Sequence, residues 1–290
     1  MSEIRIEGKG ELYPLWISRI LVTAVSPEWA LTGARAASGF GNKKGVEAGV
    51  DIRPDSTIDN RPGVIMMICA PNKKLLENEL ARRIFQSLLP CPTVSVYDAM
   101  IKDPNVKKLE IGKAISLFGD GFQKKGMFNE REVWSIPTME GNMLVESTFG
   151  IIEGVSTNII IIGKKDVALK AGMEFTEVIQ DTEGVICPFS GGMTKFIIKL
   201  DSLKYDFMKK KGTIDHRFCP DLKAKVKDTE MLPDTAAYQI VVDSIDVINL
   251  FQALNRGIEE IKDMKGVLKI TATTFEGKLG PEKYDLTEIL

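Results

Sequence analysis

Residues 19–25, Arg-Ile-Leu-Val-Thr-Ala-Val, are followed by Ser26, Pro27 and Glu28, and this junction decides the fold. The apolar run, rich in β-branched residues, is typical of a strand. Ser26 supplies the oxygen of an N-cap, and Pro27 and Glu28 suit the first turn of a helix, which we expect to end near Ala37. The stretch therefore predicts a strand that passes directly into a helix.

The chain continues in the same alternation after an expected polar loop that contains Gly41, Gly45 and Gly49 and leads to residues 61–63. Residues 64–70 form an apolar run that is typical of a strand covered on both faces. A helix is expected from Pro71 and Asn72, because apolar residues then recur along one face. These residues are Leu76, Leu80, Ile84 and Leu88. A third strand is expected at residues 93–97.

The second half of the chain repeats this order. Its expected strands are residues 158–162, 184–187, 238–242 and 266–272. Between them lie two helical patterns. The first carries Val167, Ala171, Phe175 and Val178, and the second begins at Ser244 and carries Val247, Phe251, Leu254, Ile258 and Ile261. The order strand, helix, strand, strand, helix, strand is that of the split βαβ unit.

The sequence therefore predicts an α+β fold with two ferredoxin-like lobes, each an antiparallel sheet with helices on one face. We expect an N-terminal lobe at residues 1–144 and a C-terminal lobe at residues 145–290. Turn residues and alternating apolar residues over 100–154 indicate hairpins that are inserted between them.

The composition excludes several classes of protein. The chain has 290 residues, of which 44% are hydrophobic and 27% charged, and its formal net charge is −2. This profile is typical of a globular protein that does not coat nucleic acid. No stretch reaches the ~18 apolar residues of a membrane span, and residues 1–11 lack the apolar run of a signal peptide. We therefore expect a cytoplasmic protein that binds neither nucleic acid nor membrane.

The cysteines and the single histidine limit the kinds of catalytic and metal site that the chain can form. The four cysteines, Cys69, Cys91, Cys187 and Cys219, are widely spaced and form no Cys-x-x-Cys pair, so we interpret them as reduced thiols. The single histidine, His216, lies in a polar segment and is interpreted as solvated. Catalytic pairs that need histidine, and metal sites that need two imidazoles, are not predicted.

Glycine, tryptophan and acidic residues leave alternatives open. Gly39 and Gly41 follow a helix, so they do not form a phosphate-binding loop. Gly191 and Gly192 form either a tight turn or a backbone that approaches a ligand. The tryptophans are interpreted as core residues, with a stacking surface for a ring as the alternative; they are Trp16, Trp29 and Trp134. Acids near turns or strand ends are solvated or catalytic; they are Glu47, Asp98, Asp120, Glu140 and Glu146.

Many short segments resemble one family, in order and over nearly the full length. In the first half they are Trp29-Ala30, residues 38–41, 47–49, 61–63, 92–93, 98–100 and 118–123. Further on they are residues 133–134, 136–137, 140–141, 149–150, 188–189, 191–192, 205–207, 219–220 and 277–280. On these segments the chain resembles formylmethanofuran:tetrahydromethanopterin formyltransferase.

The resemblance implies transfer of a formyl group from formylmethanofuran to N5 of tetrahydromethanopterin, as in methanogenesis-type one-carbon metabolism. It implies two ferredoxin-like lobes, a homo-oligomer (dimer or tetramer), no metal and no tightly bound cofactor. Methanofuran and tetrahydromethanopterin are then the co-substrates. Within the matching segments we expect a set of residues to bind them, namely Trp29, Phe40, Gly41, Glu146, Gly191, Gly192 and Tyr205.

One departure from the family concerns the catalytic acid. In the family a glutamate in a Tyr-Glu-Ile-Val strand is placed to protonate the oxyanion, whereas this chain has Gln239 in Tyr238-Gln239-Ile240-Val241. An amide donates a hydrogen bond but no proton, and loss of a catalytic acid typically costs about 10²–10⁴ in rate. We expect Gln239 to hydrogen-bond the oxyanion and Glu47 or Glu146 to supply the proton.

Two functions from different classes follow. The first is formyl transfer with Gln239 and Glu47 as catalytic residues. The second is a catalytically impaired paralogue that binds a one-carbon carrier coenzyme or serves as a subunit of a formyl-handling complex. Other departures, such as Ser156-Thr157-Asn158 in place of Gly-Gly-Asn, keep the second hypothesis open.

Overall fold

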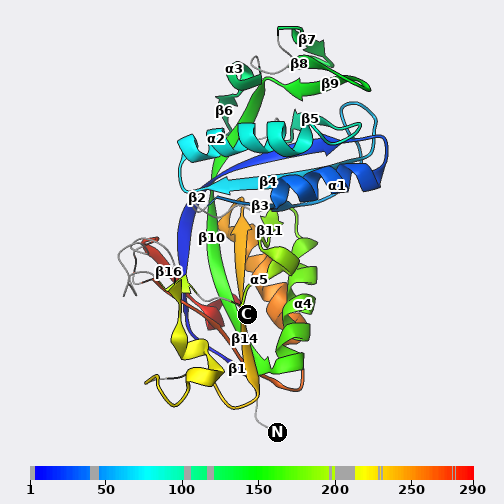
Figure 1. Cartoon of the computed structure of the whole chain (residues 1–290). Coiled ribbons are helices and arrows are strands. Elements are labelled where there is room, and N and C mark those ends of the chain that lie inside the picture. Colours follow the sequence, from blue (N-terminus) through cyan, green and yellow to red (C-terminus); the bar gives the residue numbers. More distant parts are fainter. Residues whose placement is uncertain are drawn as a thin grey trace. The chain divides into compact units, whose positions relative to one another are not determined.

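A computed structural model gives the fold of the chain (Figure 1). The residues it describes are 4–39, 46–100, 106–115, 121–195, 198–199, 213–227, 229, 231–275, 277 and 279–290. The chain forms two compact units, which we call the first lobe (residues 15–154) and the second lobe (residues 1–14 and 155–290). Strands β2 (Lys9–Thr23) and β10 (Thr148–Lys164) contribute residues to both. The expected division of the chain into domains at residues 1–144 and 145–290 stays a prediction.

The first lobe has the predicted split βαβ order. Its central sheet runs β5–β2–β4–β3, and all of these neighbours are antiparallel. Besides β2, its elements are α1 (Pro27–Ser38), β3 (Glu47–Val50), β4 (Gly63–Ala70), α2 (Lys73–Arg83) and β5 (Ser95–Asp98). Strand β3 lies where a loop was expected; its two ends are half-buried and only its middle is apolar and buried, so no strand pattern stands out.

Local capping begins both helices of this lobe. The Ser26 side chain accepts a hydrogen bond from the backbone N–H of Trp29, with Pro27 as the first residue of α1. Asn72 accepts in the same way from Leu75 at the start of α2. Each side chain satisfies an N–H that has no partner within the helix, which is why the predicted start positions are confirmed.

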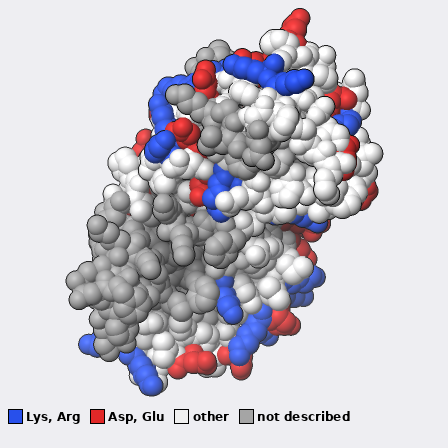
Figure 2. All heavy atoms as spheres, turned by 45° about the horizontal axis from the view of Figure 1, so that its top comes forward, with Lys and Arg blue, Asp and Glu red and all other residues white. Residues whose placement is uncertain are grey.

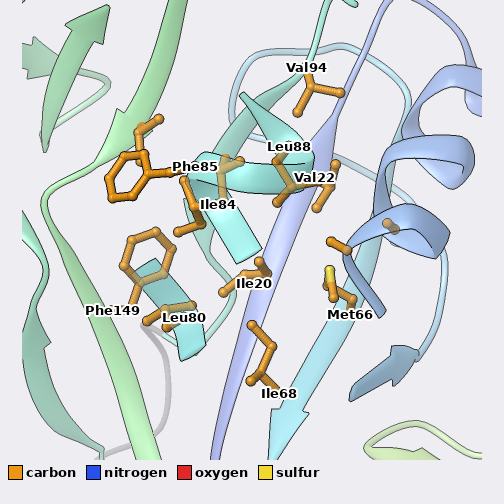
Figure 3. Packing of buried hydrophobic residues seen from close by; sticks show 14 of the residues in the cluster. Ile20, Val22, Met66, Ile68, Leu80, Ile84, Phe85, Leu88, Val94 and Phe149 are labelled. Carbon is orange, nitrogen blue, oxygen red and sulfur yellow. The ribbon is translucent and has the colours of Figure 1, made fainter. Parts of the chain in front are cut away.

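Helix α2 packs its apolar face on the sheet, as Figure 3 shows. The predicted stripe is fully buried and continues into a π-helical turn, η1 (Ile84–Leu88). It contacts the side chains of β2 and β4 that point to the helix side, including Ile20, Val22, Met66 and Ile68. Burial of each such side chain contributes about 1.5–3 kcal/mol, so this layer is the main source of the lobe's stability.

The predicted hairpin insertion also forms, and it adds a parallel strand to the sheet of the first lobe. Strands β7 (Lys124–Phe128), β8 (Arg131–Thr138) and β9 (Gly141–Glu146) make an antiparallel meander. Strand β9 then pairs with β5 in parallel, at Val96 and Val145. The four central strands of each lobe pair antiparallel, as predicted. The sheets are nevertheless mixed, because β9 in the first lobe and β1 in the second add at an edge in parallel.

The second lobe repeats the split βαβ order with β15–β10–β14–β11. Besides β10, its elements are α4 (Lys165–Gln180), β11 (Val185–Ile186), β14 (Thr235–Ser244), α5 (Val247–Ile261) and β15 (Val267–Ala272). Helix α5 is capped by Asp246 rather than by Ser244. Strand β1 (Arg5–Ile6) adds to β15 in parallel, and β16 (Glu282–Asp285) pairs with the start of β2.

Glu11, near the start of β2, holds a segment more than 260 positions away in the sequence. Its carboxylate has no solvent exposure and accepts four backbone hydrogen bonds, from Phe275 (2.7 Å), Gly277 (3.0 Å), Leu279 (3.0 Å) and Gly280 (2.8 Å). Burial by itself raises the pKa of Glu11, but the four N–H groups outweigh it and lower the pKa below its ordinary value. The carboxylate therefore serves as a structural anchor.

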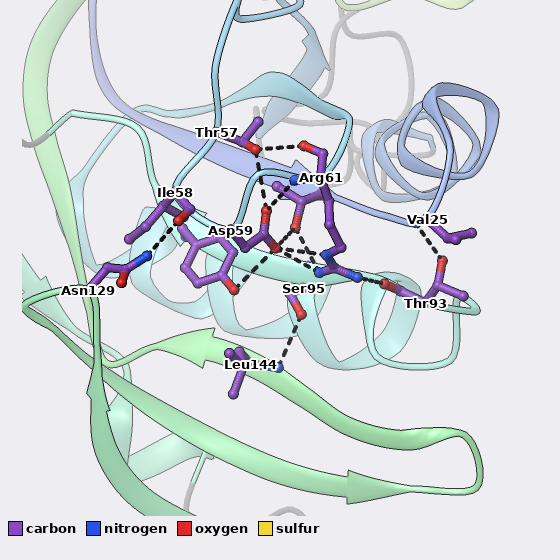
Figure 4. Close-up of polar contacts among 11 residues, drawn as sticks. Val25, Thr57, Ile58, Asp59, Arg61, Thr93, Ser95, Asn129 and Leu144 are labelled. Atoms are coloured by element: carbon purple, nitrogen blue, oxygen red, sulfur yellow. Dashed lines mark hydrogen bonds and ion pairs between the residues drawn. The ribbon is translucent and has the colours of Figure 1, made fainter.

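A second carboxylate anchors the loop between β3 and β4 (Figure 4). Asp59 accepts hydrogen bonds from Thr23 (2.6 Å), Arg61 (2.9 Å), Thr57 (3.3 Å) and the Tyr97 hydroxyl (3.3 Å). Burial raises the pKa of Asp59, but the bonds from Thr23 and Arg61 and the charge of Arg61 outweigh burial and lower the pKa. The loop is thereby tied to strands β2 and β5.

The surface has no dominant sign of charge on the face shown in Figure 2, where basic and acidic side chains are interspersed. Among the described residues, no helix is both long enough and apolar enough to cross a bilayer.

Replacing Glu11 by glutamine is expected to lower the free energy of unfolding by roughly 2–6 kcal/mol near pH 7. The new NH₂ group would face two backbone N–H donors and leave them without an acceptor, at about 1–3 kcal/mol each. Because the folded pKa is lowered, this stabilisation is present above the unfolded pKa of about 4.3 and is lost as pH falls through the folded pKa. Urea titrations at about pH 7 and about pH 3 should show the gap between the two proteins narrowing on acidification.

Glu7→Gln, in an exposed side chain four positions away, is the matched control and should stay within about 0.5 kcal/mol of the unmodified protein. An equal effect of both variants would contradict the anchoring role of Glu11.

Asp59→Asn is expected to destabilise the protein by about 3 kcal/mol, because it leaves the Arg61 guanidinium beside Thr23 without its counter-charge. Asp55→Asn, in an exposed residue of the same loop, serves as the control. The shift of the urea midpoint measures the effect, and a midpoint unchanged by Asp59→Asn would show that the network does not hold the loop.

Candidate functional site

Gln239 lies in the middle of β14, within a ten-residue antiparallel ladder that pairs Val155–Lys164 with Thr235–Ser244. Its Cα is opposite Ile160, and its backbone exchanges two further hydrogen bonds with Thr194 (2.8 and 2.9 Å) on the other edge. The side chain is 2% exposed. Its oxygen, Oε1, is buried and has no hydrogen-bond partner among the residues that the structure describes.

Strand alternation sets the face on which Gln239 lies. Ile240 and Val242 belong to the core beneath α4 and α5, so Gln239 and Val241 point to the opposite face. On that face Ile160 packs with Ile162 and Met231 in a small separate cluster. Gln239 is therefore a buried polar group beside an apolar cluster, on the side of the sheet that the helices leave uncovered.

Asn158 lies on the same face, two positions from the residue opposite Gln239. Its side chain is fully buried and makes two polar contacts: Nδ2 donates to the Tyr13 hydroxyl, and Oδ1 accepts from Thr273 Oγ1 (2.6 Å). The Tyr13 ring packs edge-on against Phe275, at 6.0 Å between centroids. This group adjoins the segment that Glu11 anchors, because Phe275 belongs to both.

The two predicted acids belong to the first lobe. Glu47 is the first residue of β3, opposite Cys69, and is half-buried. Glu146 ends β9 and is 6% exposed. Its Oε2 accepts the Asp98 backbone N–H (2.8 Å) and pairs with Arg131 (3.0 Å). The structure therefore gives Glu47 and Glu146 different surroundings.

Burial has the largest effect on the pKa of Glu146. It raises the pKa of Glu146 above its ordinary value, and the charge of Asp98 adds to the rise. The Asp98 N–H and Arg131 oppose the shift without cancelling it. A carboxyl with a raised pKa keeps its proton to higher pH, which is the property a general acid requires.

The tryptophans do not all belong to the core. Trp29 on α1 is 41% exposed, so its interpretation as a core residue was wrong. Trp16 and Trp134 pack partly buried against the core of the first lobe. The ammonium groups of Lys73 and Lys107 lie 4.3 and 4.8 Å from the centre of the Trp16 ring. Position on an amphipathic helix does not by itself tell which large residue faces solvent.

Gly191 and Gly192 form a tight turn, η2 (Ser190–Gly192), with φ of 67° and 78°. A Cβ on Gly192 would lie 2.7 Å from Thr176, so glycine is required there for packing as well as for conformation. No atom of the described residues lies within 4 Å of the corresponding point on Gly191. The tight turn is confirmed, and its approach to a ligand stays a prediction. The turn leads directly into Thr194 beside Gln239.

Other predicted residues stand as follows. Phe40, Gly41 and Tyr205 lie outside the described residues. His216 is exposed in a short 3-10 helix, η4 (His216–Phe218), which confirms the interpretation of a solvated histidine. The four cysteines form no disulfide, as expected.

A groove of about 560 Å³ lies elsewhere, along α5. It is lined by Ile248, Phe251, Gln252, Asn255, Arg256 and Ile289. All but Ile289 are on α5, and Ile289 ends the last 3-10 helix, whereas Gln239 points to the face of the sheet opposite α4 and α5. Gln239, the residue at the position of the family's catalytic acid, therefore does not line this groove.

Sequence reasoning did not single out Glu11, Tyr13 and Thr273. Each lies near one end of the chain, and Tyr13 is 145 positions from its partner Asn158. No motif links them. Only the register of β10 brings Asn158 and its partners onto the face of Gln239.

Comparison with known proteins covers both lobes. The family model of formylmethanofuran-tetrahydromethanopterin formyltransferase matches residues 3–138, and the model of its proximal lobe matches residues 141–289. The enzyme of that name from Methanocaldococcus jannaschii is 38% identical over 96% of this chain and 95% of its own length. The one from Methanothermobacter thermautotrophicus is 37% identical with the same coverage.

Solved structures agree with the family models. The formyltransferase from Methanosarcina barkeri superposes with a TM-score of 0.89, at 34% identity over 99% of this chain and 98% of that one. A formyltransferase/hydrolase complex from Methylorubrum extorquens, solved with methylofuran, contains a chain with a TM-score of 0.86 and 27% identity. That match covers 98% of this chain and 96% of the other. This chain belongs to the formylmethanofuran–tetrahydromethanopterin formyltransferase family.

Proposed function

We propose that this protein transfers a formyl group from formylmethanofuran to N5 of tetrahydromethanopterin. The observation that carries the proposal is the match along both lobes to proteins of that name, at up to 38% identity over 96% of the chain. In the reaction, N5 attacks the formamide carbon, forms the new C–N bond and loses its proton. The oxyanion then collapses, the old C–N bond breaks, and the methanofuran nitrogen leaves as an amine after gaining a proton.

Gln239 is proposed to contact the reacting group through its amide. The NH₂ group is a donor for the oxyanion, and Oε1 is an acceptor for an N–H of either coenzyme. Oε1 is buried and has no partner in the part of the chain that the structure describes, which supports this role, because an unsatisfied acceptor costs about 1–3 kcal/mol and a ligand N–H would remove that cost. An amide in this position orients and stabilises the oxyanion, while the proton comes from another group.

The proton is proposed to come from Glu47 or Glu146. The raised pKa of Glu146 supports its candidacy, because the protonated form is then populated closer to neutral pH. Glu47 is half-buried at the start of β3, within residues 47–49, one of the segments that match the family. The remaining proposed coenzyme contacts are Trp29, Phe40, Gly41, Gly191, Gly192 and Tyr205. The exposed ring of Trp29 is available for stacking.

The proposal includes a cytoplasmic homo-oligomer, a dimer or tetramer, that uses the two coenzymes as substrates and holds no tightly bound cofactor. Orientation of two large coenzymes supplies a substantial share of the rate, on the order of 7–11 kcal/mol in favourable cases.

Gln239 also motivates the second function, a paralogue that binds a one-carbon carrier without turning it over or acts as a subunit of a formyl-handling complex. The Methylorubrum extorquens chain, whose structure is that of a formyltransferase/hydrolase complex, gives this alternative a structural precedent. Calorimetric titration with each coenzyme, beside a turnover assay, separates the two: binding without formyl transfer supports the second function.

Gln239→Glu is expected to raise kcat, by up to about 10²–10⁴, because a carboxyl at this buried position donates a proton as well as a hydrogen bond. The assay follows formation of formyl-tetrahydromethanopterin from formylmethanofuran. Gln252→Glu adds a carboxyl at an exposed position of α5 and should leave the rate unchanged. Absence of turnover in both the unmodified protein and Gln239→Glu would refute formyl transfer as the function.

Glu146→Gln and Glu47→Gln test the proton source, and removal of the acid is expected to lower kcat about 10²–10⁴-fold. If Glu146 is the acid, activity falls as pH rises through its raised pKa, since only the protonated form donates. Glu146→Gln should remove that limb of the pH–rate profile. Glu153→Gln, in an exposed side chain, is the control. Unchanged profiles in both variants would exclude Glu47 and Glu146 as the source.

A further inference from the structure

Thr93 has a strained backbone at one end of the first lobe. It is the third residue of a turn over residues 91–94, in which the Val94 N–H donates to the Cys91 carbonyl at 3.5 Å. Pro92 takes the second position, and Thr93 has a φ of 63°. Glycine or asparagine usually occupies the third position of such a turn, because a β-branched residue is strained in the left-handed region. The threonine therefore costs stability that a glycine would not cost.

The polar groups of Thr93 bind three separate segments. Its hydroxyl accepts the backbone N–H of Val25 (3.2 Å), its carbonyl accepts from Nη1 of Arg61 (2.6 Å), and its N–H donates to the carboxylate of Glu140. Figure 4 shows the first two of these bonds. A glycine would keep the bonds to Arg61 and Glu140, because they use the backbone of residue 93. What the threonine adds is the bond that holds the start of α1.

The strand register brings these segments to the same end of the sheet. Thr23, which ends β2, is opposite Gly63 at the start of β4 and opposite Ser95 at the start of β5. Strand β9 is parallel to β5, so it also begins at this end. The link between β2 and α1 and the turn between β8 and β9 are therefore neighbours, and Thr93 contacts both.

Large apolar side chains are exposed around Thr93. Val25 is 62% exposed, and Trp29, one helical turn further on, is 41% exposed. Met139, next to Glu140 in the turn between β8 and β9, is fully exposed. We call Val25, Trp29 and Met139 the apolar patch. Clustered apolar residues on a surface mark interaction sites, and tryptophan and methionine are enriched in protein interfaces.

Helix α1 lies directly on the strained turn. A Cβ on Gly33, four positions after Trp29 and on the same side of the helix, would lie 3.2 Å from Val94 and 3.3 Å from Cys91. Because α1 and the turn pack this closely, the exposed residues at the start of α1 are held in a fixed position beside Thr93.

Charges of both signs surround the apolar patch. Glu28 and Arg53 are exposed, and the Ser26 hydroxyl and, to a smaller extent, the charge of Arg53 lower the pKa of Glu28. Glu140 adds a second acid. A two-fold contact sets a surface against itself, so its charges are complementary only if both signs are present. Anionic lipid or nucleic acid would call for mainly basic residues. The pattern therefore fits a second copy of this chain.

We propose that the apolar patch, flanked by Glu28, Arg53 and Glu140, is the surface through which two copies of this chain associate. Thr93 is the residue that positions the patch, because it ties the start of α1 to the turn between β8 and β9. The inference rests on the homo-oligomer that the proposed function includes, and it names the contact surface of that oligomer.

Sedimentation velocity of the full-length protein, without coenzymes, tests the surface. The unmodified protein should sediment as a dimer or larger oligomer. Met139→Glu and Trp29→Glu each place a charge at the centre of the contact and should raise the dissociation constant at least about tenfold. Ile248→Glu, the same change at a 70% exposed residue of α5, is the matched control and should leave the dissociation constant unchanged. Circular dichroism checks that each variant is folded.

Thr93→Gly and Thr93→Ser test the positioning role. Glycine removes the strain and also the hydroxyl that holds Val25, so the dissociation constant should rise about 2- to 10-fold, as expected for one lost hydrogen bond. Serine keeps the hydroxyl and should associate like the unmodified protein. An unchanged dissociation constant in Thr93→Gly would overturn the role of Thr93.

The remaining outcomes separate this inference from the proposed reaction. A monomeric unmodified protein overturns the inference, and so does dissociation by Ile248→Glu without an effect of Met139→Glu and Trp29→Glu. Weaker calorimetric binding of a coenzyme by Trp29→Glu, with the oligomer unchanged, overturns it as well and assigns Trp29 to the coenzyme. Formyl transfer is tested separately by the turnover assay, because sedimentation requires no coenzyme.

Discussion

The antiparallel register between β10 and β14 is the constraint on which the second lobe depends. Ten consecutive pairs fix which side chains face the helices and which face away. Because side chains alternate, a slip of one residue would turn Gln239 into the core and expose Ile240 and Val242. Exposing Ile240 and Val242 would cost free energy, and this cost stabilises the observed register. The register in turn places Gln239 and Asn158 on one face of the sheet.

Two buried carboxylates show how surroundings decide what an acid does. Glu11 accepts four backbone N–H groups, so its pKa is lowered and it anchors a segment as an anion. Glu146 has fewer compensating bonds, burial prevails, and its pKa is raised. The same chemical group is thus structural in one lobe and suited to proton donation in the other.

Local patterns account for what could be predicted of the fold. Helices α1 and α2 begin where Ser26 and Asn72 provide caps, and the stripe that ends at Leu88 is buried as expected. Strand β3 was missed, and the parallel edge strand β9 was not foreseen. Both are held by pairing with distant strands, which leaves little trace in a short stretch of sequence.

The sequence by itself determined the α+β order of each lobe, the absence of an acid at position 239 and the family segments, because capping, periodicity and residue identity are local properties. Tertiary structure alone decided that Tyr13 meets Asn158 across 145 positions and that Glu11 binds the backbone N–H groups of Phe275, Gly277, Leu279 and Gly280. Tertiary structure also decided that Trp29 lies on the surface and that the pKa of Glu146 is raised. Burial, dielectric surroundings and hydrogen-bond partners arise only when distant strands pair, and no single stretch of chain contains them.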